Sequence, residues 1–287
     1  MSTRRAFNGP WLSHLILIGL GTTMLYPFLW LISSSLKPNA EIFSTTNLIP
    51  STFAWDNYAR GWSAMPRLPF SVFIQNSLFI SSMAVVGTVI CSTLVGFGFA
   101  RLDFRFKKPL FALMLATLML PYQAVLVPQY IVFKNLGWVN TYLPLTVPPF
   151  FGVGVGGVSG AFFIFLMVQF MRGIPRELDE AAQIDGCSTF GIYWRVILPL
   201  CTAPIATVAI FSFLWTWDDF IHPVIYLADP NKFVVSQGLR LFMDNTAAVS
   251  WGGLFAMSVI AILPNLVIFL LAQKHFVEGI ATSGLKG

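Results

Sequence analysis

Six long apolar segments constrain this chain more than any other feature of its sequence. They cover residues 11–33, 72–100, 110–127, 143–171, 199–221 and 254–272. A helix needs about 20 apolar residues to cross a hydrocarbon core of about 30 Å, and these segments are of that order. Charged residues make up only 10% of the chain, whereas soluble domains contain about 25%. The sequence therefore predicts an all-α integral membrane protein with six transmembrane helices.

The lysines and arginines between these segments predict the orientation of the chain. With a cytoplasmic N-terminus, the inner segments carry 11 of the 17 cations and the outer segments carry six. The short stretch RLDFRFKK after the second segment alone carries four of them. The positive-inside rule then puts both termini in the cytoplasm. We expect cytoplasmic tails at 1–10 and 273–287 around a transmembrane domain at 11–272, with the first segment retained as an anchor.

The stretch IPRELDEAAQIDG gathers four of the 12 acidic residues into the predicted cytoplasmic loop between the fourth and fifth segments. Pro175 suits a helix start, early acids complement the positive helix end, and Gly186 is a natural stop. These signals predict a short helix that ends near Asp185. One narrow face of this helix, suited to a groove on a partner protein, would carry Leu178, Ala181, Ala182 and Asp185.

Catalysis and metal binding are weaker interpretations of the same acids. A catalytic carboxylate pair needs a cleft that excludes water and separates the two pKa values. A metal site needs oxygen ligands that converge from a loop, which helical spacing does not provide. The sequence therefore predicts no catalytic and no metal-binding residue in this loop.

A second polar group lies at the outer end of the fifth segment, in SFLWTWDDFIHP. Its tryptophans and acids fit either an interfacial belt or the lining of a substrate route. Polar residues inside the apolar segments fit either interhelical hydrogen bonds or substrate contacts. The candidate route residues are Asn76, Gln123, Trp215, Trp217, Asp218 and Asp219.

The glycines of GVGVGG match the spacing G-x-G-x-x-G, but they lie inside a predicted membrane span. A dinucleotide site needs that pattern between a strand and a helix, so we reject it here. Gly152, Gly156 and Gly160 are instead spaced at i, i+4 and i+8. This spacing predicts a smooth helix face for close helix packing.

The acidic loop also carries a family motif. The stretch EAAQIDGCSTFGIYWRVILP has the form E-A-A-x3-G-x9-[IV]-x-L-P, with Val196 at the position where isoleucine is commonest. It resembles the EAA loop, here 172–198, of inner-membrane permeases in binding-protein-dependent ABC importers. The final stretch LPNLVIFLLAQKHFVEGIATSGLKG resembles the tail of MalG-type carbohydrate permeases, which also have six spans.

This resemblance implies a set of partners. They are a second homologous permease that completes a heterodimer, two ATPase subunits that bind ATP and Mg, and an extracytoplasmic solute-binding protein that delivers a sugar. The chain would lie among lipids of a bacterial or archaeal cytoplasmic membrane. It would bind no nucleic acid and no cofactor, and it contains no G-x-x-x-x-G-K-[ST] phosphate loop. The implied ATPase-coupling residues are Leu178, Glu180, Ala181, Ala182, Asp185, Gly186, Leu198 and Pro199.

Three alternatives remain open at this point. Closely similar permeases carry glycerol 3-phosphate or its diesters, and the outer segments show no charge bias against or toward anions. An ion-coupled secondary carrier would show internal repeats and midplane charges, which we do not find in the sequence. A membrane enzyme would have to use Asp218, Asp219 and His222.

Overall fold

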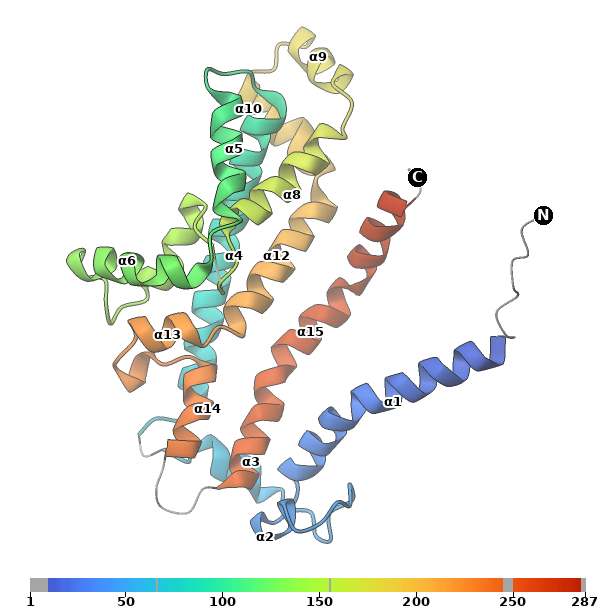
Figure 1. Cartoon of the computed structure of the whole chain (residues 1–287), viewed down its shortest axis with the longest axis vertical. Helices are drawn as coiled ribbons and strands as arrows, with labels where there is room; N and C mark the ends of the chain where they lie inside the picture. The colour runs from blue at the N-terminus through green and yellow to red at the C-terminus, as the bar shows by residue number, and fades with distance from the viewer. Residues whose placement is uncertain (1–9, 66, 155, 245–249, 285–287) are drawn as a thin grey trace. The chain divides into compact units, whose positions relative to one another are not determined.

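The computed structural model describes residues 10–65, 67–154, 156–244 and 250–284, with backbone alone for 10, 244 and 272–284. Within these ranges the regular structure is helical, as the apolar segments predict (Figure 1). The chain forms two compact units. One contains the residues up to Phe70 and Leu239–Ile262, and the other contains Ser71–Gly238 and the residues from Leu263 onward. Of the predicted tails, residues 1–9 and 285–287 lie outside what the structure describes, as do the side chains of residues 10 and 273–284.

The first unit contains α1 (Pro10–Ser35), α2 (Asn39–Ile42), α3 (Asp56–Trp62) and the start of α15 (Trp251–Gly284). The buried amide of Asn57 donates hydrogen bonds to the main-chain oxygens of Ser35 and Lys37, at 3.0 and 2.9 Å. At the start of α15, the amide of Gly252 donates to Asn39 Oδ1 at 2.8 Å. Side-chain amides thus connect α3 to the end of α1, and α2 to the start of α15.

The second unit holds every candidate site residue described below. Its elements are α4 (Phe70–Arg101), α5 (Lys107–Thr117), α6 (Tyr122–Asn135), α7 (Leu143–Thr146), η1 (Pro148–Phe151), α8 (Gly160–Arg172), α9 (Glu177–Ile184), α10 (Thr189–Ile192), η2 (Tyr193–Ile197), α11 (Leu198–Leu200), α12 (Thr202–Trp217), α13 (Ile221–Tyr226), η3 (Pro230–Lys232) and most of α14 (Val235–Asp244). A buried cluster at its centre joins α4, α8, α12 and the α9–η2 segment.

Three helices are long and apolar enough to cross a membrane, and they match three predicted segments. They are Trp11–Ser35, Phe70–Arg101 and Trp251–Leu271. The number rises to five if each of two bent helix pairs counts as one span. The described structure does not establish the predicted number of six, and the orientation of the termini stays a prediction.

The predicted span 110–127 is not a single straight helix. It divides into α5 and α6, whose axes are bent by 101° relative to each other. Pro121 stands just before α6 in an extended conformation. A proline has no amide hydrogen and its ring clashes with the preceding turn, so the break falls where the chain meets this residue.

The predicted span 143–171 is wrong as a continuous helix. Only α8 remains as a longer helix, with 13 residues. Gly152 and Gly156 have positive φ angles of 75° and 54°, so they cannot belong to a right-handed helix. The predicted helical face of Gly152, Gly156 and Gly160 is therefore also wrong. The glycines do allow close packing, because a Cβ on Gly156 would lie 2.2 Å from the Trp215 main-chain oxygen.

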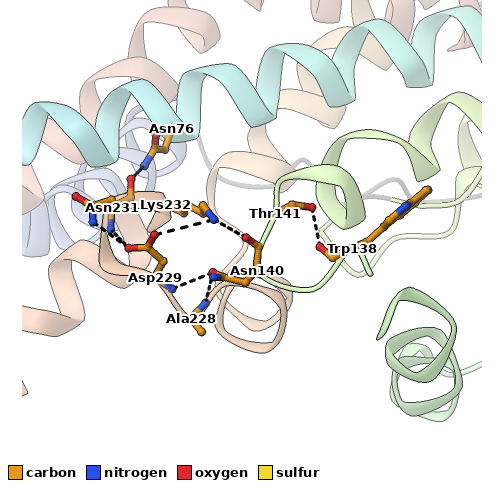
Figure 2. A network of polar contacts seen from close by, with 8 residues as sticks. All are labelled: Asn76, Trp138, Asn140, Thr141, Ala228, Asp229, Asn231 and Lys232. Atoms are coloured by element: carbon orange, nitrogen blue, oxygen red, sulfur yellow. Dashed lines mark hydrogen bonds and ion pairs between the residues drawn. The ribbon is translucent and has the colours of Figure 1, made fainter. Parts of the chain in front are cut away.

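A polar network closes the loops at one end of the second unit (Figure 2). Asn140 adopts a left-handed φ of 61°, and its Oδ1 accepts from the amides of Ala228 and Asp229 at 3.2 and 3.0 Å. Lys232 Nζ donates to the Asn140 main-chain oxygen at 2.7 Å. The side chain and the amide of Asn231 donate to Asp229 and lower the pKa of that carboxyl below its ordinary value. Two separate loops are thereby tied into one polar layer.

Candidate coupling helix and substrate cavity

The acidic stretch forms α9, and the predicted stop at Gly186 is confirmed. Gly186 has a φ of 82°. Its amide donates to the Gln183 oxygen at 3.0 Å, while the Cys187 amide donates to the Ala182 oxygen at 2.9 Å. This is the Schellman pattern, which needs a left-handed residue after the helix. Ser188 then caps α10, because its hydroxyl accepts from the Gly191 amide at 3.2 Å.

The faces of α9 differ in part from the predicted arrangement. Ala182 is 8% exposed and belongs to the buried cluster, so it is not part of the open face. Leu178 is 42% exposed and Ile184 is 87% exposed. Ala181, Asp185 and Gly186 are also exposed. Sequence reasoning missed Ile184. Its position three residues after Ala181, which itself lies three residues after Leu178, is the signal that could have placed these side chains next to one another on the helix surface.

An ion pair anchors α9 to the last residue of α4. Arg101 Nε lies 3.4 Å from Asp179 Oδ2, and these side chains are only 3% and 14% exposed. Arg101 Nη2 also donates to the Ile174 main-chain oxygen at 2.9 Å. Farther along, the hydroxyls of Tyr193 and Thr93 are hydrogen-bonded at 3.0 Å. The sequence predicted a role for Arg101 only in orientation, and for Asp179 only as an early acid at the positive end of the helix.

The remaining predicted coupling residues lie around this anchor. Glu180 is exposed on α9. Leu198 is half-buried and packs against the central cluster, whereas Pro199 is exposed. The segment before Pro199 is a π-helical turn over Tyr193–Ile197. Such turns often mark functional positions in helices.

A cavity of about 330 Å³ lies between the break after α5, the irregular glycine segment and the end of α12. Its volume falls at the lower end of the range of roughly 300–1,000 Å³ for small-molecule sites. The polar groups that line it come from Ser77, Thr117, Tyr122, Gln129, Ser159, Thr216, Asp219 and His222. The lining therefore combines apolar walls with several hydroxyl, amide and carboxylate groups.

The most buried polar pair of the cavity wall is Asp219 and His222. Their side chains are 9% and 13% exposed, and Asp219 Oδ2 lies 2.6 Å from His222 Nδ1. The ring of Tyr122 lies 4.6 Å from the His222 ring. Among the described residues, no group pairs with the buried Tyr122 hydroxyl. An unpaired buried hydroxyl is costly, so this group is available to a ligand.

The other predicted route residues do not line this cavity. Asn76 donates hydrogen bonds to the main-chain oxygens of Asn231 and Phe233. Asp218 Oδ1 accepts from Asn265 Nδ2 at 2.8 Å. Trp215 packs on Phe162 and Phe163, and Trp217 stacks on Phe213. Gln123 is exposed, and only Asp219 of the predicted set faces the cavity.

Comparison with known proteins identifies the family. The model of the "binding-protein-dependent transport system inner membrane component" family matches residues 89–280, which include α9, its anchor and most of the cavity. The chain belongs to this family. It is therefore a membrane-embedded permease, and its family implies a solute-binding protein and an ATPase as partners.

Two relatives and one solved structure agree with this assignment of the permease. The probable ABC transporter permease protein YurM of Bacillus subtilis is 33% identical over 91% of this chain and 84% of YurM. The arabinooligosaccharides transport system permease protein AraQ of Halalkalibacterium halodurans is 30% identical over 98% of this chain and 99% of AraQ. A bacterial ABC transporter involved in the import of the acidic polysaccharide alginate matches with a TM-score of 0.81 and 19% identity. That match covers 95% of this chain and 100% of the other, and it shows a shared fold.

Proposed function

We propose that this chain is the permease subunit of an ATP-driven ABC importer for a mono- or oligosaccharide. The exposed face of α9, anchored through Asp179 inside the family region, is the observation that carries the proposal. Relatives supply the substrate class, since their names give arabinooligosaccharides, galactooligosaccharides, diacetylchitobiose and sulfoquinovosyl glycerol. Each of these names contains a sugar unit, and none of them is glycerol 3-phosphate.

In the proposed assembly, a second homologous permease completes a heterodimeric pathway and two ATPase subunits bind ATP and Mg. A solute-binding protein delivers the sugar from outside the cytoplasmic membrane of a bacterium or archaeon. The chain crosses that membrane six times with both termini inside. The α9 helix then docks on an ATPase through Leu178, Ala181 and Ile184, which supply apolar contact area.

The cavity provides a substrate route within this subunit, with Asp219 as the principal polar group. A carboxylate is a strong hydrogen-bond acceptor and suits the hydroxyl groups of a sugar. Among the described residues that line the cavity, none is a lysine or an arginine. A phosphate group would lack a cationic partner there. This charge pattern favours sugar over glycerol 3-phosphate.

Transport by the complete complex tests this function. The test uses proteoliposomes that contain both permeases, the ATPases and the binding protein. They should accumulate a radiolabelled galacto- or arabinooligosaccharide only when ATP is present on the side of the membrane that carries the ATPases. Vanadate should abolish uptake, because the energy comes from ATP hydrolysis. Uptake that persists with vanadate or without ATPase subunits would contradict the proposal. So would import of glycerol 3-phosphate in place of any sugar.

Replacing Gly186 by valine should reduce the sugar imported per ATP hydrolysed. A β-branched residue at a φ of 82° costs roughly 1–3 kcal/mol of strain, which displaces the end of α9. Gly137→Val is the matched control, because Gly137 has a φ of 70° and also lies in open space. The coupling role of Gly186 is wrong if both variants transport with the wild-type ratio, or if both lose it equally.

A further inference from the structure

The ion pair at the end of α4 connects two elements that the family motif alone does not relate. Arg101 is the last residue of α4, Asp179 belongs to α9, and Ile174 lies in the link before α9. The guanidinium reaches both, at 3.4 Å from Asp179 Oδ2 and 2.9 Å from the Ile174 oxygen. A single side chain therefore holds α9 and its preceding link against the end of α4.

Burial makes this contact costlier to break than a surface ion pair, because removing one partner leaves an uncompensated buried charge. Arg101 and Asp179 are nearly shielded from solvent, so their attraction is little screened. Asp179 Oδ1 has no hydrogen-bond partner among the described residues, which leaves Arg101 as the compensating group. The hydroxyl pair of Thr93 and Tyr193 forms a second attachment of this segment to α4. Thr93 precedes Arg101 by eight residues, or about 12 Å along a helix.

The opposite end of α4 is attached just as specifically. Asn76 Nδ2 donates to the main-chain oxygens of Asn231 and Phe233, at 3.0 and 2.9 Å. The neighbouring Ser77 Oγ accepts from the Val235 amide at 2.8 Å. Figure 2 shows Asn76 reaching from α4 to the loop that also holds Asp229 and Lys232. The helix therefore contacts α9 near one end and the loop 229–235 near the other.

We infer that α4 acts as a rigid lever, and that Arg101 is the positioning residue that transmits a displacement of α9 to α4. The helix has 32 residues, which corresponds to about 48 Å. Its internal hydrogen bonds make it stiff along its axis, so movement at Arg101 also moves Asn76 and Ser77. The loop 229–235 then shifts with them, at the side of the cavity where Ser77 contributes to the wall. This inference rests on the proposed ATP-driven sugar import.

The test uses the complete transporter in proteoliposomes and measures galactooligosaccharide imported per ATP hydrolysed. The variants are Arg101→Gln, Asp179→Asn and the double variant that carries both changes. Arg105→Gln is the matched control, since Arg105 is four residues away, exposed and outside the ion pair. Size-exclusion chromatography and thermal unfolding in detergent establish which variants assemble.

Each single variant should lower the transport ratio by roughly 3- to 30-fold, the range seen when a residue that couples two sites is altered. The double variant removes the unpaired buried charge, so its thermal stability should exceed that of the single variants. Its transport ratio should stay low, because the connection to α4 is still missing. Adding Asn76→Ala to Arg101→Gln should lower the ratio little further, since both residues lie on one path.

Two results would overturn the lever while leaving the transporter assignment intact. One is a double variant that regains both stability and the wild-type transport ratio, because the pair would then serve only to neutralise a buried charge. The other is an assembled Arg101→Gln variant with the wild-type ratio. By contrast, a wild-type complex that imports no sugar with ATP would overturn the proposed function itself, and the lever with it.

Discussion

Replacing Gly156 by alanine is expected to destabilise the second unit by about 2–5 kcal/mol and to abolish transport. The added Cβ would lie 2.2 Å from the Trp215 main-chain oxygen, a distance that only a backbone shift could relieve. The positive φ of Gly156 adds strain for any residue with a side chain. The measurement is thermal unfolding of the purified protein in detergent, followed by tryptophan fluorescence.

Gly137→Ala separates the two causes of this loss. Gly137 has a similar φ of 70°, but no atom lies within 4 Å of the position that its Cβ would take. We expect this control to lose only about 1–2 kcal/mol, from conformational strain. If Gly156→Ala were no less stable than Gly137→Ala, close contact between the glycine segment and α12 would not be a determinant of the fold.

The second large effect concerns the cavity, where Asp219→Asn should reduce sugar uptake by about tenfold or more. Hydrogen bonds to a charged group are worth about 1.5–3 kcal/mol, and the substitution removes the charge while keeping the size. The Asp219 carboxylate is also the partner of His222 at 2.6 Å, so its loss affects two groups of the cavity wall. Initial uptake rates at saturating binding protein are the measurement, with assembly confirmed by size-exclusion chromatography.

A pair of tyrosines provides the control for simple destabilisation of this region. Tyr122 and Tyr226 both bury a hydroxyl for which the described residues supply no partner, but only Tyr122 lines the cavity. Tyr122→Phe should reduce uptake roughly three- to tenfold without loss of stability. Tyr226→Phe should leave both unchanged. Equal uptake by wild type, Asp219→Asn and Tyr122→Phe would rule out a substrate contact at this cavity.

The long helices were predictable because hydropathy alone determines them. Phe70–Arg101 and Trp251–Leu271 lie within three residues of the predicted segments at each end. The C-terminal end of α9 was predictable for a similar reason, since Gly186 is a local signal that acts within a few residues. These elements depend on the chemistry of neighbouring residues rather than on contacts between distant segments.

The breaks in the chain were not predictable in the same way. Proline and glycine are tolerated inside spanning helices when neighbouring elements satisfy the backbone, so Pro121 and Gly156 did not by themselves show where a helix ends. The inward turn of Ala182 also depends on a distant contact, because Asp179 pairs with a residue 78 positions earlier in the chain. The role of Asn76 likewise depends on distant residues, because its side chain donates hydrogen bonds to loop carbonyls more than 150 positions later in the chain.

The irregular backbone at residues 152–154 and 156–159 has a consequence for hydration. Peptide groups outside a helix cannot be exposed to hydrocarbon, and at membrane depth they persist only where protein or water surrounds them. This segment lines the cavity together with Asp219 and His222. We therefore expect ordered water in this cavity when no ligand is bound, and an arriving ligand then displaces that water and takes over the same hydrogen bonds through its hydroxyl groups.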